Sequence, residues 1–254
     1  MLPVRLPLFT LFVVAASALD LPSNFQKCDR NKSDFDKCLV DAVNKALVLL
    51  KDGNKEFGMS RLEPLHVKSM VIDTGSGSPI NLRQTFKEVD VHDLISGSRV
   101  VRYRTDLNKH LIICDSKSDR IRVLGDYEMS GRILLLPIVG KGKTNITLVD
   151  THIEHQLIGE PYEKNGVKYM KLREYKVDFK PKRVYMHFEN LFNDKVLSEG
   201  MNRFIDENWE AVFSGLKEGY SKGFGSIFRD LSNRIFTKVP MDQIFLRNSI
   251  EGSK

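Results

Sequence analysis

The feature that most constrains the fold is a change of hydrophobic period along the chain. Between residues 66 and 188, apolar and polar side chains alternate with period two, as in half-buried β-strands. Between residues 189 and 236, apolar side chains recur every three or four positions, as on one face of a helix. Long strands joined by short turns predict an antiparallel sheet, and a Phe-rich helix needs a large apolar partner surface. The pattern therefore predicts an α+β fold with one curved sheet wrapped along a long C-terminal helix.

Helical and turn signals divide the chain further. Residues 35–50 carry apolar side chains at helical spacing, and we expect this helix to end near Gly53. After residue 189 we expect about three helical turns and then a helix of roughly 25–30 residues, which Pro240 ends. Gly, Ser, Asn and Asp clusters predict turns at residues 75–79, 96–98, 115–118, 140–142 and 164–166.

The ends of the chain differ from its middle. Residues 1–18 combine a basic start, an apolar core and a small-residue cleavage site, which predicts a secretory signal peptide. No other apolar run approaches the length of a membrane span. We therefore expect a secreted, extracellular and monomeric protein, with a single domain at residues 19–247 and a flexible tail at residues 248–254.

The charge balance is mildly basic. Lys and Arg number 39 against 33 Asp and Glu, a formal net charge of +6. The densest basic cluster consists of Arg99, Arg102, Arg104, Arg120 and Arg122. Because Tyr103 is the only stacking aromatic residue among these arginines, we expect no nucleic-acid partner. The cluster leaves open contact with a receptor or an anionic membrane surface.

A search for catalytic or cofactor motifs finds none. Gly140 and Gly142 are not followed by a third glycine or a helix, as a phosphate-binding loop requires. His152 and His155 lie three apart on a predicted strand, so they point to opposite faces and cannot share a metal ion. The residues predict no enzyme, no cofactor and no metal site.

Residues 125–150 carry a combination of motifs that points to a family. The pattern consists of Gly125, Tyr127, Gly131, Leu134, Leu136, Pro137, Ile138, Gly140, Gly142, Asn145, Thr147 and Leu148. Together with residues 208–210, 235–236, 239–242 and 244–246, this pattern resembles the insect takeout and juvenile-hormone-binding protein family. The resemblance covers residues 20–247 and implies a roll in which the sheet and helix enclose a hydrophobic tunnel. It also associates the chain with circadian and feeding-related proteins.

The resemblance also bears on covalent features. Cys28 and Cys38 sit where the family has paired cysteines, and oxidation is expected outside the cell. Because Cys114 stands alone, the chain is more similar to takeout than to the hormone carriers proper, and we expect a buried free thiol. Sequons for N-glycosylation occur at Asn31 and Asn145, the latter with an alternative role in turn geometry.

The function that the resemblance implies is carriage of a small hydrophobic ligand without catalysis. Suitable ligands are juvenile-hormone-like terpenoids, fatty acids or similar lipids. Tyr127, Trp209 and Tyr220 are expected to make polar contacts, because each has a donor that needs a partner when buried. The candidate ligand-binding residues are Phe57, Met59, Leu62, Phe86, Val89, Val91, Tyr127, Leu134, Leu136, Phe179, Met186, Phe188, Trp209, Phe213, Tyr220 and Phe228. Each could instead be ordinary core, and an extracellular signalling or interaction module acting through the basic cluster is the alternative function.

Overall fold

The structure is a computed structural model that describes residues 18–74, 80–133 and 136–247. The predicted C-terminal tail, and the predicted signal peptide except for Ala18, lie outside the described residues. The elements follow the predicted order of helix, strands and helices. They are β1 (Cys28–Asp29), α1 (Phe35–Leu50), β2 (Leu65–Asp73), β3 (Ile80–His92), β4 (Ser98–Asp106), the 3-10 helix η1 (Leu107–Lys109), β5 (Leu111–Ile133), β6 (Leu136–Lys164), β7 (Val167–Phe188), α2 (Lys195–Glu207), α3 (Trp209–Phe236), α4 (Met241–Ile244) and β8 (Phe245–Leu246).

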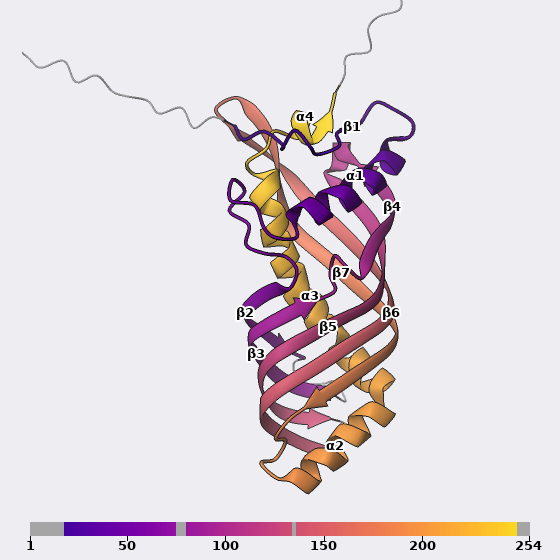
Figure 1. The fold of residues 1–254 in the computed structure, drawn as a ribbon, viewed down its shortest axis with the longest axis vertical. Helices are drawn as coiled ribbons and strands as arrows, with labels where there is room; N and C mark the ends of the chain where they lie inside the picture. The colour runs from indigo at the N-terminus through magenta and orange to yellow at the C-terminus, as the bar shows by residue number, and fades with distance from the viewer. Residues whose placement is uncertain (1–17, 75–79, 134–135, 248–254) are drawn as a thin grey trace, which may run out of the picture.

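One antiparallel sheet dominates the molecule. Its strand order is β2-β3-β5-β6-β7, and β4 pairs with the first part of β5, before β3 takes over the same edge. Strands β5, β6 and β7 are 23, 29 and 22 residues long. Figure 1 shows the sheet curling around α3 as an elongated roll, with α1 near one end and α2 at the other. The predicted α+β roll is therefore confirmed.

Helix α3 lies between two edge strands of the sheet. On the β2 side, Gly219 packs so closely that a Cβ there would lie 2.5 Å from Ile72 Cγ2. On the β7 side, Gly225 faces the carbonyl oxygen of Tyr175 equally closely. The helix thus approaches both edges at glycines, and it closes the roll where no strand pairing does.

Asparagines on the helices bind the backbone of the strands. Asn233 of α3 accepts a hydrogen bond from the N–H of Leu172 at 2.8 Å and donates to its carbonyl oxygen at 2.9 Å. Two other asparagines likewise accept a hydrogen bond from the N–H of one strand residue and donate one to its carbonyl oxygen. Asn44 of α1 does so with Val100 of β4, and Asn202 of α2 does so with Phe188 of β7. Each side-chain amide therefore pairs with a strand residue as a neighbouring strand would.

Two of the predicted turns are wrong. Residues 140–142 lie within β6 and residues 115–118 lie within β5, whereas the turns predicted at 96–98 and 164–166 are confirmed. The turn predicted at 75–79 falls outside the described residues. Small and polar residues mimic turn signals here, but strand pairing satisfies their backbone without a turn: β4 and β6 pair with residues 115–118, and β5 pairs with residues 140–142.

Gly140 serves close packing instead of a turn. It pairs with Met129 in the ladder, and a Cβ at this position would lie 2.6 Å from the hydroxyl oxygen of Tyr127. Asn145 is likewise an exposed strand residue opposite Leu124, so its alternative role in turn geometry is wrong.

The apolar residues at the start of the second strand do not all reach the interior. Leu136 was expected in the core or cavity, but its exposed fraction is 43% because it begins β6 at the end of the hairpin. Leu134, its companion in that prediction, lies outside the described residues.

We expect Gly140→Ala to lower the free energy of unfolding by about 1–3 kcal/mol, because the added methyl group overpacks against Tyr127. Gly200→Ala in α2 is the control, since nothing lies within 4 Å of its Cβ position. It should stabilise by about 0.5–1 kcal/mol through helix propensity. Urea unfolding followed by circular dichroism measures both values, and equal effects would contradict the packing argument.

Asn233→Ala should destabilise the protein by about 2 kcal/mol, because it leaves the N–H and carbonyl of Leu172 without their partner. Ser226→Ala, on the exposed side of the same helix, should change the stability by less than about 0.5 kcal/mol. Thermal unfolding of the two variants would test the difference, and a neutral Asn233→Ala would show that the edge contact is dispensable.

Candidate functional site: an internal hydrophobic cavity

A cavity of about 380 Å³ lies between α1, the inner face of the sheet and the second half of α3. This volume falls in the range that small-molecule sites occupy. Apolar side chains from elements far apart in the sequence line it, and they include Ala42, Val43, Ala46 and Leu47 of α1, Met59 and Leu62 of the following loop, Val100 of β4, Ile112 of β5, Ile153 and Leu157 of β6, Phe179 of β7, and Phe228, Leu231 and Ile235 of α3.

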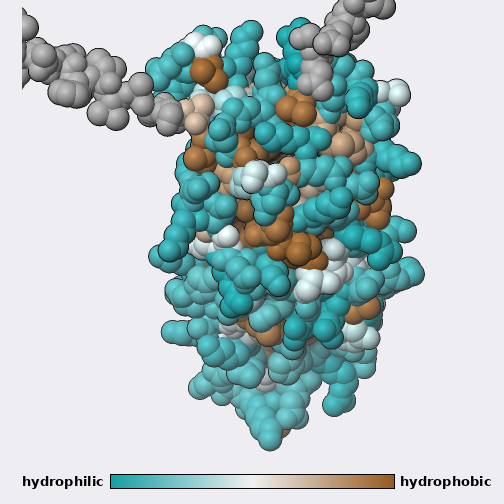
Figure 2. Space-filling model, turned by 45° about the horizontal axis from the view of Figure 1, so that its top comes forward, coloured by the Kyte–Doolittle hydropathy of each residue, from teal (hydrophilic) through white to brown (hydrophobic). Residues whose placement is uncertain are grey.

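The cavity is partly open to solvent at its rim, where the exposed Arg99 belongs to its lining. Figure 2 shows hydrophobic side chains gathered on this end of the molecule among hydrophilic ones. Val48 and Leu49 of α1 are exposed by 57% and 45% but do not belong to the lining. The cavity therefore has a rim at which an apolar molecule could enter or leave.

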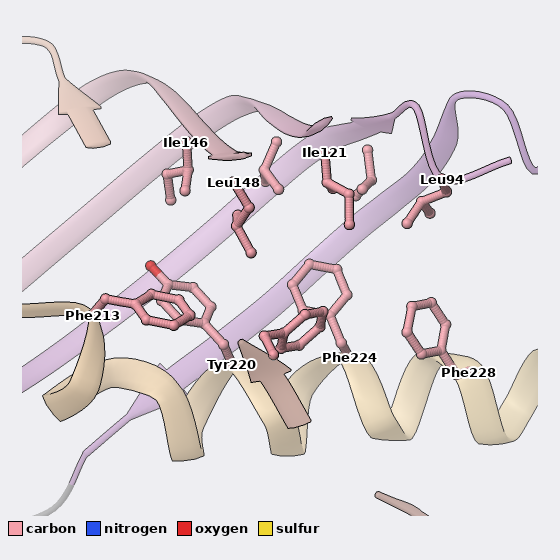
Figure 3. A pocket seen from close by; sticks show the side chains of 11 residues that line it. Leu94, Ile121, Ile146, Leu148, Phe213, Tyr220, Phe224 and Phe228 are labelled. Atoms are coloured by element: carbon pink, nitrogen blue, oxygen red, sulfur yellow. The ribbon is translucent and has the colours of Figure 1, made fainter. Parts of the chain in front are cut away.

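A narrow space of about 30 Å³ lies deeper in the roll, next to the cavity. The two share Leu94, Phe179 and Phe228 in their linings. Figure 3 shows the aromatic side chains of α3 pointing at aliphatic side chains of the sheet across this space: Phe213, Tyr220, Phe224 and Phe228 face Leu94, Ile121, Ile146 and Leu148. The space is about the size of one water molecule, so aromatic packing fills this part of the tunnel.

Three of the polar side chains in the lining contact one another. Ser116 of β5, His155 of β6 and Tyr175 of β7 all face the cavity from adjacent strands. The hydroxyl of Ser116 lies 2.9 Å from Nε2 of His155, and the hydroxyl of Tyr175 lies 3.0 Å from Nδ1. The three form one hydrogen-bonded row, which we call the polar cluster.

Burial sets the charge of the polar cluster. It lowers the pKa of His155 to about 4, with a smaller opposing effect from the carboxylate of Asp115. It also raises the pKa of Tyr175 well above its usual range. At neutral pH the cluster is therefore uncharged, and among the described lining residues Arg99 at the rim carries the only permanent charge.

The hydroxyl–imidazole–hydroxyl row resembles the connectivity of a nucleophile, a base and an orienting group. However, Ser116 lies in the middle of β5, opposite Val100 on one side and Ile153 on the other. Its backbone is therefore part of a strand paired on both sides, in contrast to a nucleophile presented on a sharp turn. The arrangement can hydrogen-bond a ligand.

The structure brings some of the predicted ligand-binding residues to the cavity and places others elsewhere. Met59, Leu62, Phe179 and Phe228 line the cavity, and Val91, Phe213 and Tyr220 line the narrow space with Phe179 and Phe228. The residues that lie in or against the core, outside both linings, are Phe57, Phe86, Val89, Tyr127, Met186, Phe188 and Trp209.

The three aromatic side chains expected to make polar contacts with a ligand contact other groups of the protein. The hydroxyl of Tyr127 donates to the carbonyl oxygen of Glu189 at 2.5 Å, and burial raises the Tyr127 pKa to about 12. Tyr220 donates to Oε1 of Gln84 at 2.9 Å. The guanidinium of Arg183 lies over the ring of Trp209, with its Cζ atom 5.4 Å from the ring centroid.

The two histidines do lie on opposite faces of β6. His155 faces the cavity, whereas His152 lies outside, 3.4 Å from Oδ1 of Asp115. Within residues 18–74, 80–133 and 136–247, no three His, Cys, Asp or Glu side chains are grouped as a metal site would need. In the same ranges no helix is both long enough and apolar enough to span a membrane.

Most of the predicted basic cluster is neutralised by carboxylates. Four of its five arginines form ion pairs, which join Arg102 and Arg104 to Asp115, and Arg120 and Arg122 to Asp93. Asp115 is only 2% exposed, and nearby arginines hold its pKa below the usual range in spite of burial. The cluster therefore presents less positive charge than its sequence suggests.

The covalent predictions are tested in part. Cys28 and Cys38 form a disulfide, and Cys114 is a buried free thiol whose pKa burial raises to about 12. Asn31 and Asn145 are both exposed, so each sequon is accessible, and glycosylation stays a prediction.

The comparison with known proteins decides the family. The haemolymph juvenile hormone binding protein (JHBP) family matches residues 8–246. The chain belongs to this family. Its JHBP-family relatives include the circadian clock-controlled protein daywake of Drosophila melanogaster, 25% identical over 88% of both chains, and that of Drosophila yakuba, 24% identical over 88% of both chains. The crystal structure of Takeout 1 from Epiphyas postvittana has the same fold. It matches this JHBP-family chain with a TM-score of 0.73 and 28% identity, over 87% of this chain and 99% of the Takeout 1 chain.

Members of the JHBP family carry hydrophobic ligands, which agrees with the apolar cavity. The sequence did not identify the polar cluster of this JHBP-family chain. Ser116 lay in a segment interpreted as a turn, and His155 was considered only as half of a metal pair. One signal in the sequence could have revealed it. Ile112, Cys114 and Ser116 are two residues apart, so on a strand their side chains share one face, and the apolar Ile112 indicates that this face points inward.

His155 makes stability pH-dependent in a defined window. The unfolded chain takes up its proton near pH 6.5 and the folded protein only near pH 4, so stability should fall as the pH drops between these values. The loss is on the order of 3 kcal/mol by pH 4. Thermal unfolding of wild type and His155→Gln across this window measures it, and the variant should lose less stability.

Exposed His66 is the control, because its hydrogen bond to Asp90 raises its pKa. Protonated His66 adds to the stability of the folded protein below pH 6.5, and this stabilisation is lost as the pH rises. In His66→Gln it is absent, so the free energy of unfolding should fall more steeply than in the wild type as the pH drops. Identical pH profiles for wild type and His155→Gln would contradict a neutral, buried His155.

Proposed function

We propose that this protein is a secreted carrier that holds a small hydrophobic ligand in the internal cavity and catalyses no reaction. The ligand class is a juvenile-hormone-like terpenoid, a fatty acid or a similar lipid. The observation that carries the proposal is the 380 Å³ cavity lined mainly by aliphatic and aromatic side chains inside a fold of the JHBP family. Secretion is supported by the disulfide Cys28–Cys38, which suits an oxidising compartment.

The energetics favour retention of an apolar chain. Each methylene group transferred from water to an apolar site contributes about 0.8 kcal/mol, so ten contribute about 8 kcal/mol. That is enough to offset much of the freedom that the ligand loses on binding. The mechanism is passive, since the cavity keeps the chain away from water until it leaves through the rim near α1.

The proposal is tested by extracting the secreted protein with organic solvent and identifying the extract by mass spectrometry. A stoichiometric lipid is the expected result. An empty extract, together with no binding of any lipid offered to the purified protein, would overturn the proposal.

Ala46→Phe should lower ligand occupancy at least about ten-fold, because the phenyl ring enters the cavity that Ala46 lines. Val48→Phe is the matched control, since it adds a ring to the exposed face of the same helix. Mass spectrometry of both variants, expressed side by side, gives the occupancy. Equal occupancy would place the ligand elsewhere.

A further inference from the structure

The polar cluster carries an inference about the ligand, which rests on the proposed function. We propose that Ser116, His155 and Tyr175 form a recognition site for one hydrogen-bond acceptor on an uncharged ligand, such as the carbonyl oxygen of an ester or ketone. The site belongs to the lining of the cavity, on the strand that pairs with β4.

The three side chains hold one more polar hydrogen than their mutual contacts use. A neutral imidazole ring has one N–H donor and one acceptor nitrogen, and each hydroxyl has one hydrogen. The ring must therefore donate at one of its two contacts and accept at the other. The hydroxyl that receives the ring's hydrogen keeps its own O–H, which is the third hydrogen of the cluster.

Within the described chain, no other hydrogen bond is made by the hydroxyl of Ser116 or of Tyr175. A donor left without a partner inside an apolar space costs about 1–3 kcal/mol. Both residues line the cavity, and the ring centroid of Phe228 lies 5.6 Å from that of Tyr175. A ligand acceptor inside the cavity would satisfy the remaining O–H and remove this cost.

The surroundings favour an uncharged ligand group over a carboxylate. The cluster is neutral at pH 7 because burial keeps His155 deprotonated. Cys114 and Tyr103, the other polar groups of the lining nearby, are also protonated, since burial raises both pKa values. An ionised carboxylate would meet no charge within the cluster, and Arg99, the charged lining residue beside Val100, is itself exposed to solvent, whereas an ester or ketone needs only the single donor.

The test measures displacement of the neutral fluorescent probe N-phenyl-naphthylamine from the full-length protein. The competitors are methyl myristate, heptadecane of similar size, and myristic acid. The triple variant Ser116→Ala/His155→Leu/Tyr175→Phe removes all three polar hydrogens of the cluster, whereas loss of a single hydroxyl would still leave one unused, because the imidazole can change tautomer. The triple variant should weaken ester binding about five-fold or more relative to heptadecane binding, the effect of one hydrogen bond, and should leave heptadecane affinity unchanged.

Matched controls separate recognition from folding. Ser118 is buried on the same strand and bonds Gly97 and Arg120 through its hydroxyl, and Tyr169 is buried on β7. Neither lines the cavity, so Ser118→Ala/Tyr169→Phe should bind ester and heptadecane as the wild type does. The infrared stretch of a ¹³C-labelled ester carbonyl gives a second readout. It should lie at lower frequency in the wild type than in the triple variant.

The outcomes are distinguishable. If the triple variant weakens ester and heptadecane binding equally, or weakens neither, the recognition site is wrong and the carrier function stands. If myristic acid loses as much affinity as the ester in the triple variant, the selectivity for an uncharged group is wrong. If none of the three competitors displaces the probe, the carrier function itself fails.

Discussion

The structure depends on how α3 meets two edges of the sheet. A six-stranded antiparallel sheet of long, twisted strands leaves open edges at β2 and β7, the ends of its strand order, and at β4, and open edges invite pairing with other chains. Helix α3 lies between β2 and β7, close to Ile72 on one side and to the carbonyl of Tyr175 on the other, at Gly219 and Gly225. Asn233 supplies backbone-like hydrogen bonds to β7. Closure by a helix in place of a strand is what makes the sheet a roll.

The same closure explains where the space inside the roll lies. At the α2 end the aromatic face of α3 fills the interior, and the gap left among Phe213, Tyr220 and Phe224 is close to a single water in size. At the other end α1 covers the roll, and its small inward residues Ala42 and Ala46 leave room for the larger cavity. The carrier function thus follows from which helix packs over which part of one concave sheet.

Local sequence patterns predicted the helices and strands correctly where a hydrophobic period extends over many residues. They predicted turns wrongly where small and polar residues lie within a strand. The helix at Phe35–Leu50, the long C-terminal helix and the antiparallel strands were predictable, because each apolar face repeats over many residues. The segments at 115–118 and 140–142 were not, since their Asp, Ser and Gly residues are accommodated by pairing partners distant in the chain. Ser116 was lost from the candidate site with the first of these errors, and Gly140 was assigned the wrong role through the second.

The amino-acid sequence alone determined the family, the order of elements, the pairing of Cys28 with Cys38 and the burial of Cys114. These properties depend on local pattern and composition, which a chain carries in linear form. Only the tertiary structure decided which apolar residues line a cavity and which fill the core, and it alone joined Ser116, His155 and Tyr175. The physical reason is that register and helix docking set these contacts, and both are long-range choices that no single segment encodes.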